Sequence, residues 1–214
     1  MKKRNLHLLT AGLLLLGAFA LWTAAVCLVD VHPIGPNGSS VGFAALNGVV
    51  HRTLGVHWPL YTLTDWLGLV PMGFVFGFAI LGLVQLIRRR SLGRVDRDIL
   101  VLGGFYLVVL AAYLLFEKFA VNYRPVLIDG FLEASYPSST TMLTLCVIPT
   151  AMLQLRRRIP RAGLRRVILW MLGIFTAFMV VGRLLSGVLW LTDIVGGALL
   201  SAGLVALYAA VTDK

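Results

Sequence analysis

Three short segments of this chain carry most of the residue types that could bind or transform an anion. They span residues 117–125, 136–141 and 182–193, and each lies next to a long apolar run. The side chains best suited to an anion are Lys118, Arg124, Ser138, Ser139 and Arg183. One guanidinium group can bind two phosphate oxygens at once, and the free backbone N–H groups at the start of a helix add further donors. The three segments therefore predict a phosphate-binding site.

Each of these residues also has a purely structural interpretation. Arg183 could form an ion pair with Asp193, which opens the next apolar run. Ser138 and Ser139 could simply cap a helix, because capping and anion binding use the same geometry. Lys118 could be one more charge at the membrane surface. The sequence leaves both interpretations open for each residue.

The elements that must position these segments are membrane-spanning helices. The chain has 214 residues, of which 59% are hydrophobic and only 13% charged, a composition too apolar for a soluble domain of this length. A span needs about 20 apolar residues. Six stretches qualify or nearly do so: 6–29, 63–87, 99–116, 139–155, 167–182 and 193–212. We therefore predict an all-α integral membrane protein, a six-transmembrane-helix bundle.

The basic residues predict how the bundle is oriented. Fifteen of the nineteen lie in clusters at 2–4, 88–97, 156–166 and at Lys214, which mark the cytoplasmic side. The four exceptions fall on the opposite side, and they are Arg52, Lys118, Arg124 and Arg183. We expect a multi-pass protein of the cell membrane with both termini in the cytoplasm and the three segments outside. The net charge of +10 does not indicate nucleic-acid binding, because the charges lie in short loops rather than on one contiguous face.

The chain reads as a single membrane domain over residues 1–214. Segment 30–62 is the longest outside piece, and we expect it to form an outer-face interfacial cap with a helix over 41–60 lying at the head groups. Residues 117–193 form the core that carries the motifs. The apolar run near the N-terminus is longer than that of a usual signal peptide, so we expect it to be the first span.

The order, spacing and membrane placement of the three segments resemble the type 2 phosphatidic acid phosphatase superfamily. That family carries a Lys-x6-Arg-Pro motif, a Pro-Ser-Gly-His motif and a Ser-Arg-x5-His-x3-Asp motif on a six-helix membrane core. The resemblance covers roughly residues 60–212, and the residues that match the three motifs are Arg124, Pro125, Pro137, Ser138, Arg183 and Asp193. It implies a lipid phosphate or pyrophosphate phosphohydrolase without cofactor or metal. The implied partner is a lipid phosphate, such as phosphatidate or phosphatidylglycerol phosphate, or a polyprenyl diphosphate.

The chain departs from the family at both histidine positions. Thr140 stands where the second motif has its His, and Leu189 stands where the third motif has its own. In the family the latter His attacks phosphorus, the Asp that matches Asp193 orients it, and the former His protonates the leaving group. Threonine is no acid near neutral pH and leucine no nucleophile. The alternative function is therefore a catalytically inactive relative that binds lipid phosphate for sensing, regulation or assembly.

Smaller departures affect the rest of the motifs. Lys118 lies five residues before Arg124 rather than six, and Glu117 occupies the family's Lys position. Ser139 replaces a Gly, and Gly182 replaces a Ser. His57 lies on the same outer side and could approach the site from the cap, although an interfacial histidine explains it as well. A transporter or scaffold is a third, weaker hypothesis, because no span carries central charges.

Overall fold

The computed structural model describes residues 3–212, and within this range the chain forms helices and no strands. Lys2 and Lys214, which belong to the predicted basic clusters, lie outside the described residues. The α-helices are α1 (Lys3–Leu28), α2 (Ala44–Leu54), α3 (Trp58–Leu67), α4 (Leu69–Arg89), α5 (Arg97–Lys118), α6 (Ser139–Arg158), α7 (Ala162–Leu185) and α8 (Leu191–Thr212). Short 3-10 turns cover Pro36–Gly38 and Leu92–Arg94. The predicted all-α class is confirmed.

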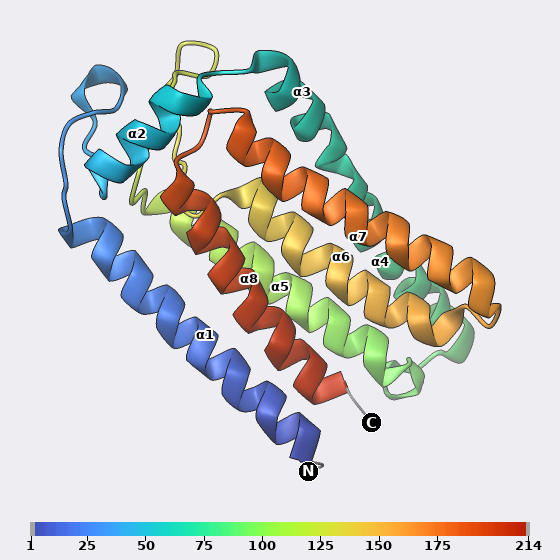
Figure 1. The fold of residues 1–214 in the computed structure, drawn as a ribbon. Helices are drawn as coiled ribbons and strands as arrows, with labels where there is room; N and C mark the ends of the chain where they lie inside the picture. Colours follow the sequence, from blue (N-terminus) through green and yellow to red (C-terminus); the bar gives the residue numbers. More distant parts are fainter. Residues whose placement is uncertain (1–2, 213–214) are drawn as a thin grey trace.

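The long helices α1 and α4–α8 run alongside one another, and α2 lies across one end of the bundle (Figure 1). Helix α8 packs most extensively against α1 and then against α6. Gly12 and Gly203 permit the close approach of α1 and α8, because an added Cβ would lie 2.7 Å from Leu207 and 2.9 Å from Leu16, respectively. Small residues at such crossings let helix backbones approach closely in membranes.

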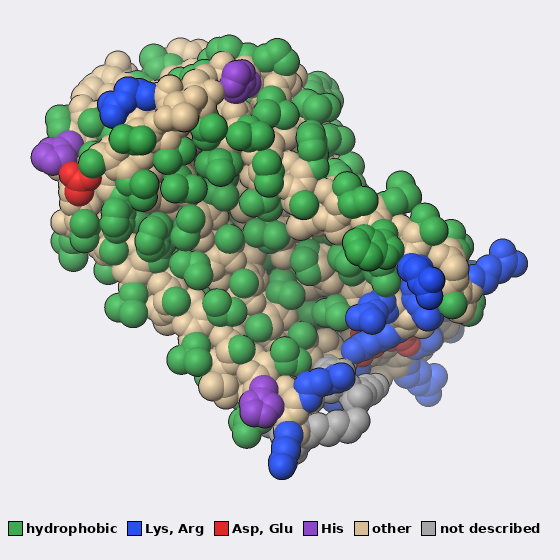
Figure 2. All heavy atoms as spheres, in the orientation of Figure 1, with side chains coloured by type: hydrophobic (Ala, Val, Ile, Leu, Met, Phe, Trp, Pro, Cys, Tyr) green, Lys and Arg blue, Asp and Glu red, His purple; other side chains and the backbone are tan. Residues whose placement is uncertain are grey.

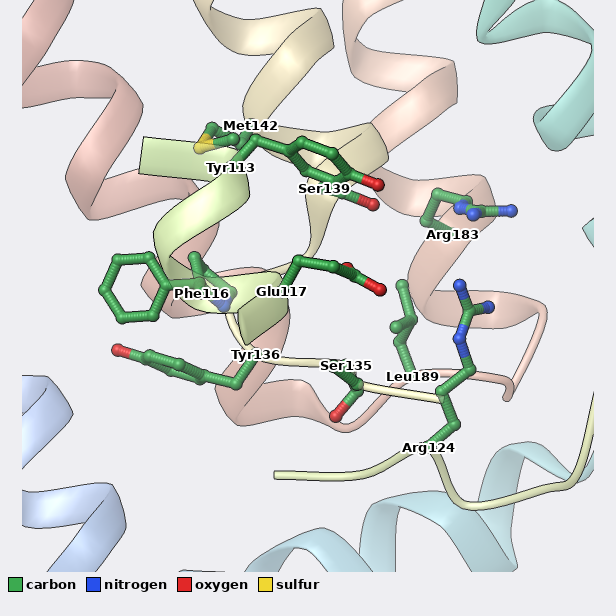
Figure 3. Close-up of a pocket in the computed structure, with 12 residues that line it drawn as sticks. Tyr113, Phe116, Glu117, Arg124, Ser135, Tyr136, Ser139, Met142, Arg183 and Leu189 are labelled. Atoms are coloured by element: carbon green, nitrogen blue, oxygen red, sulfur yellow. The ribbon is translucent and has the colours of Figure 1, made fainter. Parts of the chain in front are cut away.

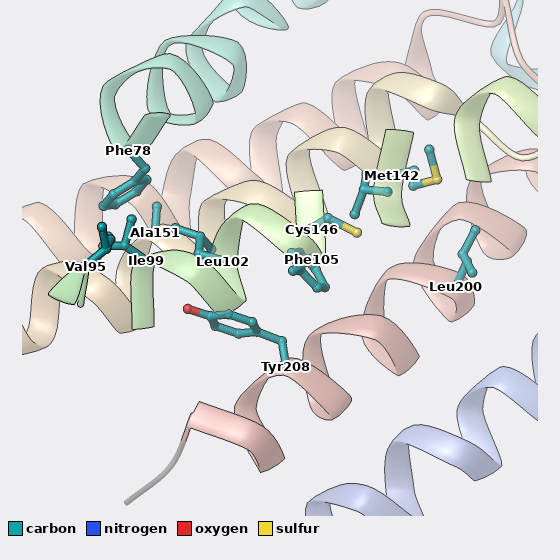
Figure 4. Close-up of a cluster of buried hydrophobic side chains, with 11 residues drawn as sticks. Phe78, Val95, Ile99, Leu102, Phe105, Met142, Cys146, Ala151, Leu200 and Tyr208 are labelled. Carbon is teal, nitrogen blue, oxygen red and sulfur yellow. The ribbon is translucent and has the colours of Figure 1, made fainter. Parts of the chain in front are cut away.

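The interior between α4, α5, α6 and α8 is a continuous apolar core (Figure 4). Its buried members come from different helices and include Phe78, Leu102, Phe105, Met142, Cys146, Leu200 and Tyr208. Lipid tails are as apolar as these side chains, so van der Waals packing rather than removal from water holds the helices together. This core fixes the ends of α5, α6 and α8, where the motif segments begin.

Among residues 3–212, five helical segments are long and apolar enough to cross a membrane: Lys3–Leu28, Trp58–Arg89, Arg97–Lys118, Ala162–Leu185 and Leu191–Thr212. Helix α6 is not among them, since its sequence contains several polar residues and ends in Arg156, Arg157 and Arg158. It nevertheless lies among the other long helices (Figure 1) and buries nine of its residues. A helix shielded by protein needs fewer apolar residues than one that faces lipid. The count of six spans therefore stays a prediction.

The helix ends differ from the edges of the apolar runs. The run predicted over 63–87 lies within two helices, α3 and α4, which meet at a turn at Gly68. Pro71 explains this break, because its ring lacks an N–H and crowds the carbonyl of Leu67 four residues earlier. Helix α7 extends beyond the predicted 167–182 at both ends, since the flanking arginines are themselves helical.

Segment 30–62 folds as a short loop followed by α2 and the start of α3. The continuous helix predicted over 41–60 is wrong: α2 ends at Leu54, Gly55 has a φ of 69°, and α3 begins at Trp58. Asn47 fastens α2 to the bundle, because its buried amide donates to Oγ1 of Thr192 at 3.0 Å and accepts from the Thr192 backbone N–H at 3.3 Å. The placement of this cap at the head groups stays a prediction.

Lys and Arg side chains gather at the end of the bundle far from α2 (Figure 2). Ion pairs join neighbouring elements there: Arg89 pairs with Asp96 at 2.9 Å, Arg157 with Asp98 at 2.7 Å, and Arg158 with Asp96 at 3.9 Å. The opposite end carries few basic residues in this view. The charge distribution thus has the two-sided pattern on which the predicted orientation depends.

Candidate functional site

The fold brings residues of all three motif segments to one small cavity. Among the residues that line it, five lie at or next to motif positions: Glu117 at the end of α5, Arg124 in the following loop, Ser139 in the first turn of α6, Arg183 in the last turn of α7, and Leu189 before α8. Figure 3 shows the guanidinium of Arg124 pointing toward Arg183, with Leu189 and the Glu117 carboxylate beside them. The cavity measures about 20 Å³, which is room for roughly one water molecule.

Arg183 is held in a fixed position by three polar partners. Its side chain is only 2% exposed. Nη2 donates to Thr140 Oγ1 at 2.8 Å and meets Asp65 Oδ1 at 3.5 Å, while Nη1 donates to Thr64 Oγ1 at 3.4 Å. Its Nε is buried and has no hydrogen-bond partner among the described residues. A buried donor without a partner costs free energy, about 1–3 kcal/mol, so this N–H is available to a ligand.

Arg124 reaches the same place from the loop after α5. Its backbone N–H donates to the carbonyl of Glu133 at 3.0 Å, and its Nε lies 3.1 Å from Glu133 Oε2. That ion pair has poor hydrogen-bond geometry, and Nε and Nη1 are buried without a hydrogen-bond partner in the described part of the chain. Both guanidinium groups lie over one ring, that of Tyr61, at 5.9 Å for Arg124 and 5.0 Å for Arg183. An anion between them would relieve their mutual repulsion.

The two serines of the second segment have different roles. Ser138 is the N-cap of α6: its Oγ accepts a hydrogen bond from the Thr141 backbone N–H at 3.3 Å and donates to Thr141 Oγ1 at 2.9 Å. Its own backbone N–H donates to the Asp193 carbonyl at 3.0 Å. Ser138 does not line the cavity, whereas Ser139 does. The capping interpretation therefore holds for Ser138, and a phosphate contact by Ser139 stays a prediction.

Asp193 is fully buried and supports the turn that carries Leu189. Its Oδ2 accepts a hydrogen bond from the Trp190 backbone N–H at 2.9 Å, and its Oδ1 accepts one from the Asn122 amide at 3.4 Å. The alternative ion pair between Arg183 and Asp193 is not formed in the structure, since Arg183 pairs with Asp65 instead. Asp193 does not line the cavity, so the position that it helps to fix is that of Leu189.

Lys118 and His57 lie outside the cavity. Lys118 is exposed, and its Nζ lies 5.8 Å from the ring of Phe119. Successive helical residues point about 100° apart, so the last turn of α5 turns Glu117 toward the cavity and Lys118 away from it. The exposed His57 places Nε2 2.9 Å from the Leu54 carbonyl oxygen. The predicted phosphate contact of Lys118 and a catalytic role for His57 stay predictions that this geometry does not support.

The positions of the two missing histidines lie close to Arg183. Leu189 lines the cavity with 5% of its surface exposed and packs with Val188 and Ile194. Thr140 accepts the 2.8 Å hydrogen bond from Arg183. Leucine has no nucleophilic atom, and the hydroxyl of threonine is no acid at neutral pH. The two arginines thus lie next to positions that lack the family's histidines.

Three residues of α3 complete the site and were not identified from the sequence: Tyr61, Thr64 and Asp65. Helix α3 approaches α7 at Gly182, where an added Cβ would lie 2.9 Å from Thr64 Cγ2. The one sequence feature that pointed to this contact is Gly182, which stands where the family's motif has a serine. It indicates a close approach by some neighbour, but no spacing in the sequence names α3 as that neighbour.

A larger apolar cavity adjoins the small one. It measures about 560 Å³, lies between α4, α5 and α6, and shares Tyr113, Ser139 and Met142 with the small cavity. Asp65 and Thr140 lie on its wall at the site end. An amphiphile whose polar group enters the small cavity would thus have an apolar space directly beside it. The exposed side chains of Tyr113 and Glu117 must swing outward to admit a group larger than water.

Comparison with known proteins agrees with this geometry. Residues 115–214 match the PAP2 superfamily. The structure resembles the crystal structure of a transmembrane PAP2-type phosphatidylglycerolphosphate phosphatase from Bacillus subtilis, with a TM-score of 0.62, 17% sequence identity and coverage of 93% of each chain. No match was found among curated protein sequences. The C-terminal part of the chain is thus similar to the PAP2 superfamily, the fold is shared with a PAP2-type phosphatase, and the apolar helices are those of a multi-pass membrane protein.

Proposed function

We propose that the protein binds the phosphate group of a membrane lipid at the outer face of the cell membrane. Arg124 and Arg183 hold the phosphate, and Ser139 at the start of α6 contributes a donor. Both termini lie in the cytoplasm in this proposal, as the basic clusters indicate. The ligand belongs to the lipid phosphates or the polyprenyl diphosphates, and its apolar chain occupies the cavity between α4, α5 and α6.

One observation carries this proposal: three buried guanidinium N–H positions have no hydrogen-bond partner in residues 3–212. They are Nε and Nη1 of Arg124 and Nε of Arg183. Buried donors of this kind are rare in folded proteins and call for an explanation. A phosphate oxygen is a suitable acceptor, because arginine forks match its geometry and charge.

Binding without turnover is the function that the site supports best. Leu189 is buried at the position where the resemblance places the nucleophile, and Thr140 is engaged by Arg183 where it places the acid. The protein is then a pseudophosphatase that senses a lipid, regulates a partner or assists assembly. Loss of a nucleophile abolishes the covalent route, whereas the clamp that stabilises charge is retained.

Hydrolysis of a lipid phosphate or diphosphate is the second candidate. The match of residues 115–214 to a phosphatase superfamily favours it. Turnover would then need direct attack of a water molecule on phosphorus. Glu117 is the one acidic residue in the cavity wall, and its carboxylate could accept the proton of that water. A diphosphate would suit this route, because a phosphate leaving group needs less protonation than an alkoxide.

The experiment that separates these candidates measures binding and phosphate release together. Purified protein in nanodiscs is incubated with phosphatidate, phosphatidylglycerol phosphate and a polyprenyl diphosphate, and bound lipid and free phosphate are both quantified. The variants are Arg183→Ala and Arg124→Ala, with Arg52→Ala as the control, because Arg52 is exposed on α2 and lines neither cavity. We expect binding that only the two clamp variants weaken, and no release. Release abolished by Arg183→Ala would establish the enzyme instead, and binding equal in all four proteins would refute the phosphate clamp.

A further inference from the structure

We propose that the head group bound here carries a cationic amine beside its phosphate, as an ethanolamine-type phospholipid does. Arg124 and Arg183 take the phosphate, and Glu117 takes the ammonium. This inference rests on the phosphate clamp of the proposed function, and it favours a phosphodiester lipid with an ammonium group over the purely anionic lipids named there.

The charges around the cavity argue against a purely anionic ligand. Each clamp arginine already faces its own carboxylate: Arg124 faces Glu133 at 3.1 Å, and Arg183 faces Asp65 at 3.5 Å. Glu117 adds a third carboxylate, and it forms no ion pair in the described part of the chain. The formal charge of these five groups is therefore one negative. A phosphomonoester, with a charge of about −1.5 to −2, would meet a site that is already acidic.

Glu117 and the two arginines reach the cavity from different elements. Glu117 comes from the end of α5, whereas the unpartnered N–H groups of Arg124 and Arg183 lie across the cavity on the loop and on α7 (Figure 3). Arg183, whose side chain is 98% buried, marks the anion side independently of the acidic groups. A ligand with a phosphate and an ammonium joined by a short linker satisfies both sides at once.

The surroundings of Glu117 suit an ammonium group. Tyr113 lines the same cavity wall, and an aromatic ring next to a carboxylate attracts organic cations through its negative face. The ring of Phe116 instead packs against Phe19 and Tyr136. Lys118, the cation nearest in sequence, lies by Phe119 and does not line the cavity. The wall on the α5 side thus offers one carboxylate and one ring to a ligand cation, without a lysine to neutralise the carboxylate.

Short-chain lipids that differ in one charge test the inference directly. The probes are dihexanoyl phosphatidylethanolamine, its N-acetyl derivative, which lacks the positive charge, and dihexanoyl phosphatidate. Affinities are measured for the wild-type protein, for Glu117→Gln and for Asp129→Asn, a control that removes an exposed carboxylate outside the cavity. We expect the wild type to bind the ethanolamine lipid roughly 2- to 5-fold more tightly than its N-acetyl derivative. Glu117→Gln is expected to abolish this preference, and Asp129→Asn is expected to keep it.

The outcomes separate this inference from the clamp on which it depends. Equal binding of the ethanolamine lipid and its N-acetyl derivative by the wild type overturns the inference, as does a preference that survives in Glu117→Gln. If Arg183→Lys and Arg124→Gln weaken both lipids in such a case, the clamp stands and only the choice of amine is wrong. If those variants weaken neither, the clamp itself fails. Glu117 is exposed at a helix end, and thermal unfolding of each variant checks that it folds.

Discussion

Gly187 connects the candidate site to the cap, and replacing it offers a quantitative test of that contact. It lies in the turn between α7 and α8 with a φ of 69°. A Cβ at this position would overlap the backbone oxygen of Gly55 and lie 2.9 Å from the Gly55 carbonyl carbon. The backbone of Gly55 cannot rotate away as a flexible side chain can. Gly187→Ala must therefore displace the cap or distort the turn that carries Leu189.

The expected cost has two parts that a control can separate. A non-glycine residue in the left-handed region costs about 1–2 kcal/mol, and forcing an extra group into a packed contact costs about 1–3 kcal/mol. Gly187→Ala should thus destabilise by roughly 2–5 kcal/mol in total. Gly130 has a φ of 84° with no atom within 4 Å of an added Cβ, so Gly130→Ala should incur only the first part.

Thermal unfolding of the purified protein in detergent measures the difference. At roughly 2–4 °C per kcal/mol for a chain of this length, Gly187→Ala should lower Tm by about 4–20 °C and Gly130→Ala by about 2–8 °C. The backbone strain is the same in both variants, so the larger fall in Tm of Gly187→Ala measures the contact with Gly55. Equal shifts in the two variants would refute the close packing of the cap on the α7–α8 turn.

Three further predictions follow from the same geometry. Leu189→His should allow a phosphohistidine to be trapped with a lipid phosphate, and adding Thr140→His should raise turnover by roughly 100-fold; failure of the double variant to bind or react would contradict a preserved pocket. Gly203→Leu should destabilise the α1–α8 contact by about 1–3 kcal/mol in thermal unfolding, and Gly173→Leu, with open space around it, should not. Burial lowers the pKa of His51 below 6.5, although a hydrogen bond with the Gly187 backbone opposes this shift. The folded protein therefore favours the neutral imidazole, so the stability that His51 contributes is present above pH 6.5 and is lost as the pH falls. Tm should drop between pH 7.5 and pH 5.5, and it should drop less in His51→Gln.

The helical segments could be predicted from the sequence, but their ends could not. Apolar runs identify which segments are helical, since only helices satisfy their backbone in lipid. They do not show where a helix stops, because arginine is a good helix former and continues a helix into the head groups. The extension of α7 and the break between α3 and α4 therefore appear only in the structure.

The candidate site, too, could be predicted only in part from the sequence. Spacing along the chain placed Arg124, Ser139 and Arg183 in the motifs, and the fold brings all three to one cavity. The phase of α5 turns Glu117 rather than Lys118 into the cavity wall, and Glu117 is the residue at the spacing of the family's Lys. The packing of α3 on α7 brought Asp65 to Arg183 across 118 positions of sequence. Such contacts depend on tertiary structure and leave no local pattern.

The most direct test of the phosphate clamp is a structure of the protein in nanodiscs with a bound short-chain lipid phosphate. The account predicts phosphate density between the two guanidinium groups, with oxygens at about 2.7–2.9 Å from Nε of Arg183 and from Nε or Nη1 of Arg124. Glu117 and Tyr113 would have moved outward from their present positions. Lipid phosphate bound elsewhere, with the clamp unchanged and its three N–H groups still unpartnered, would contradict the central claim.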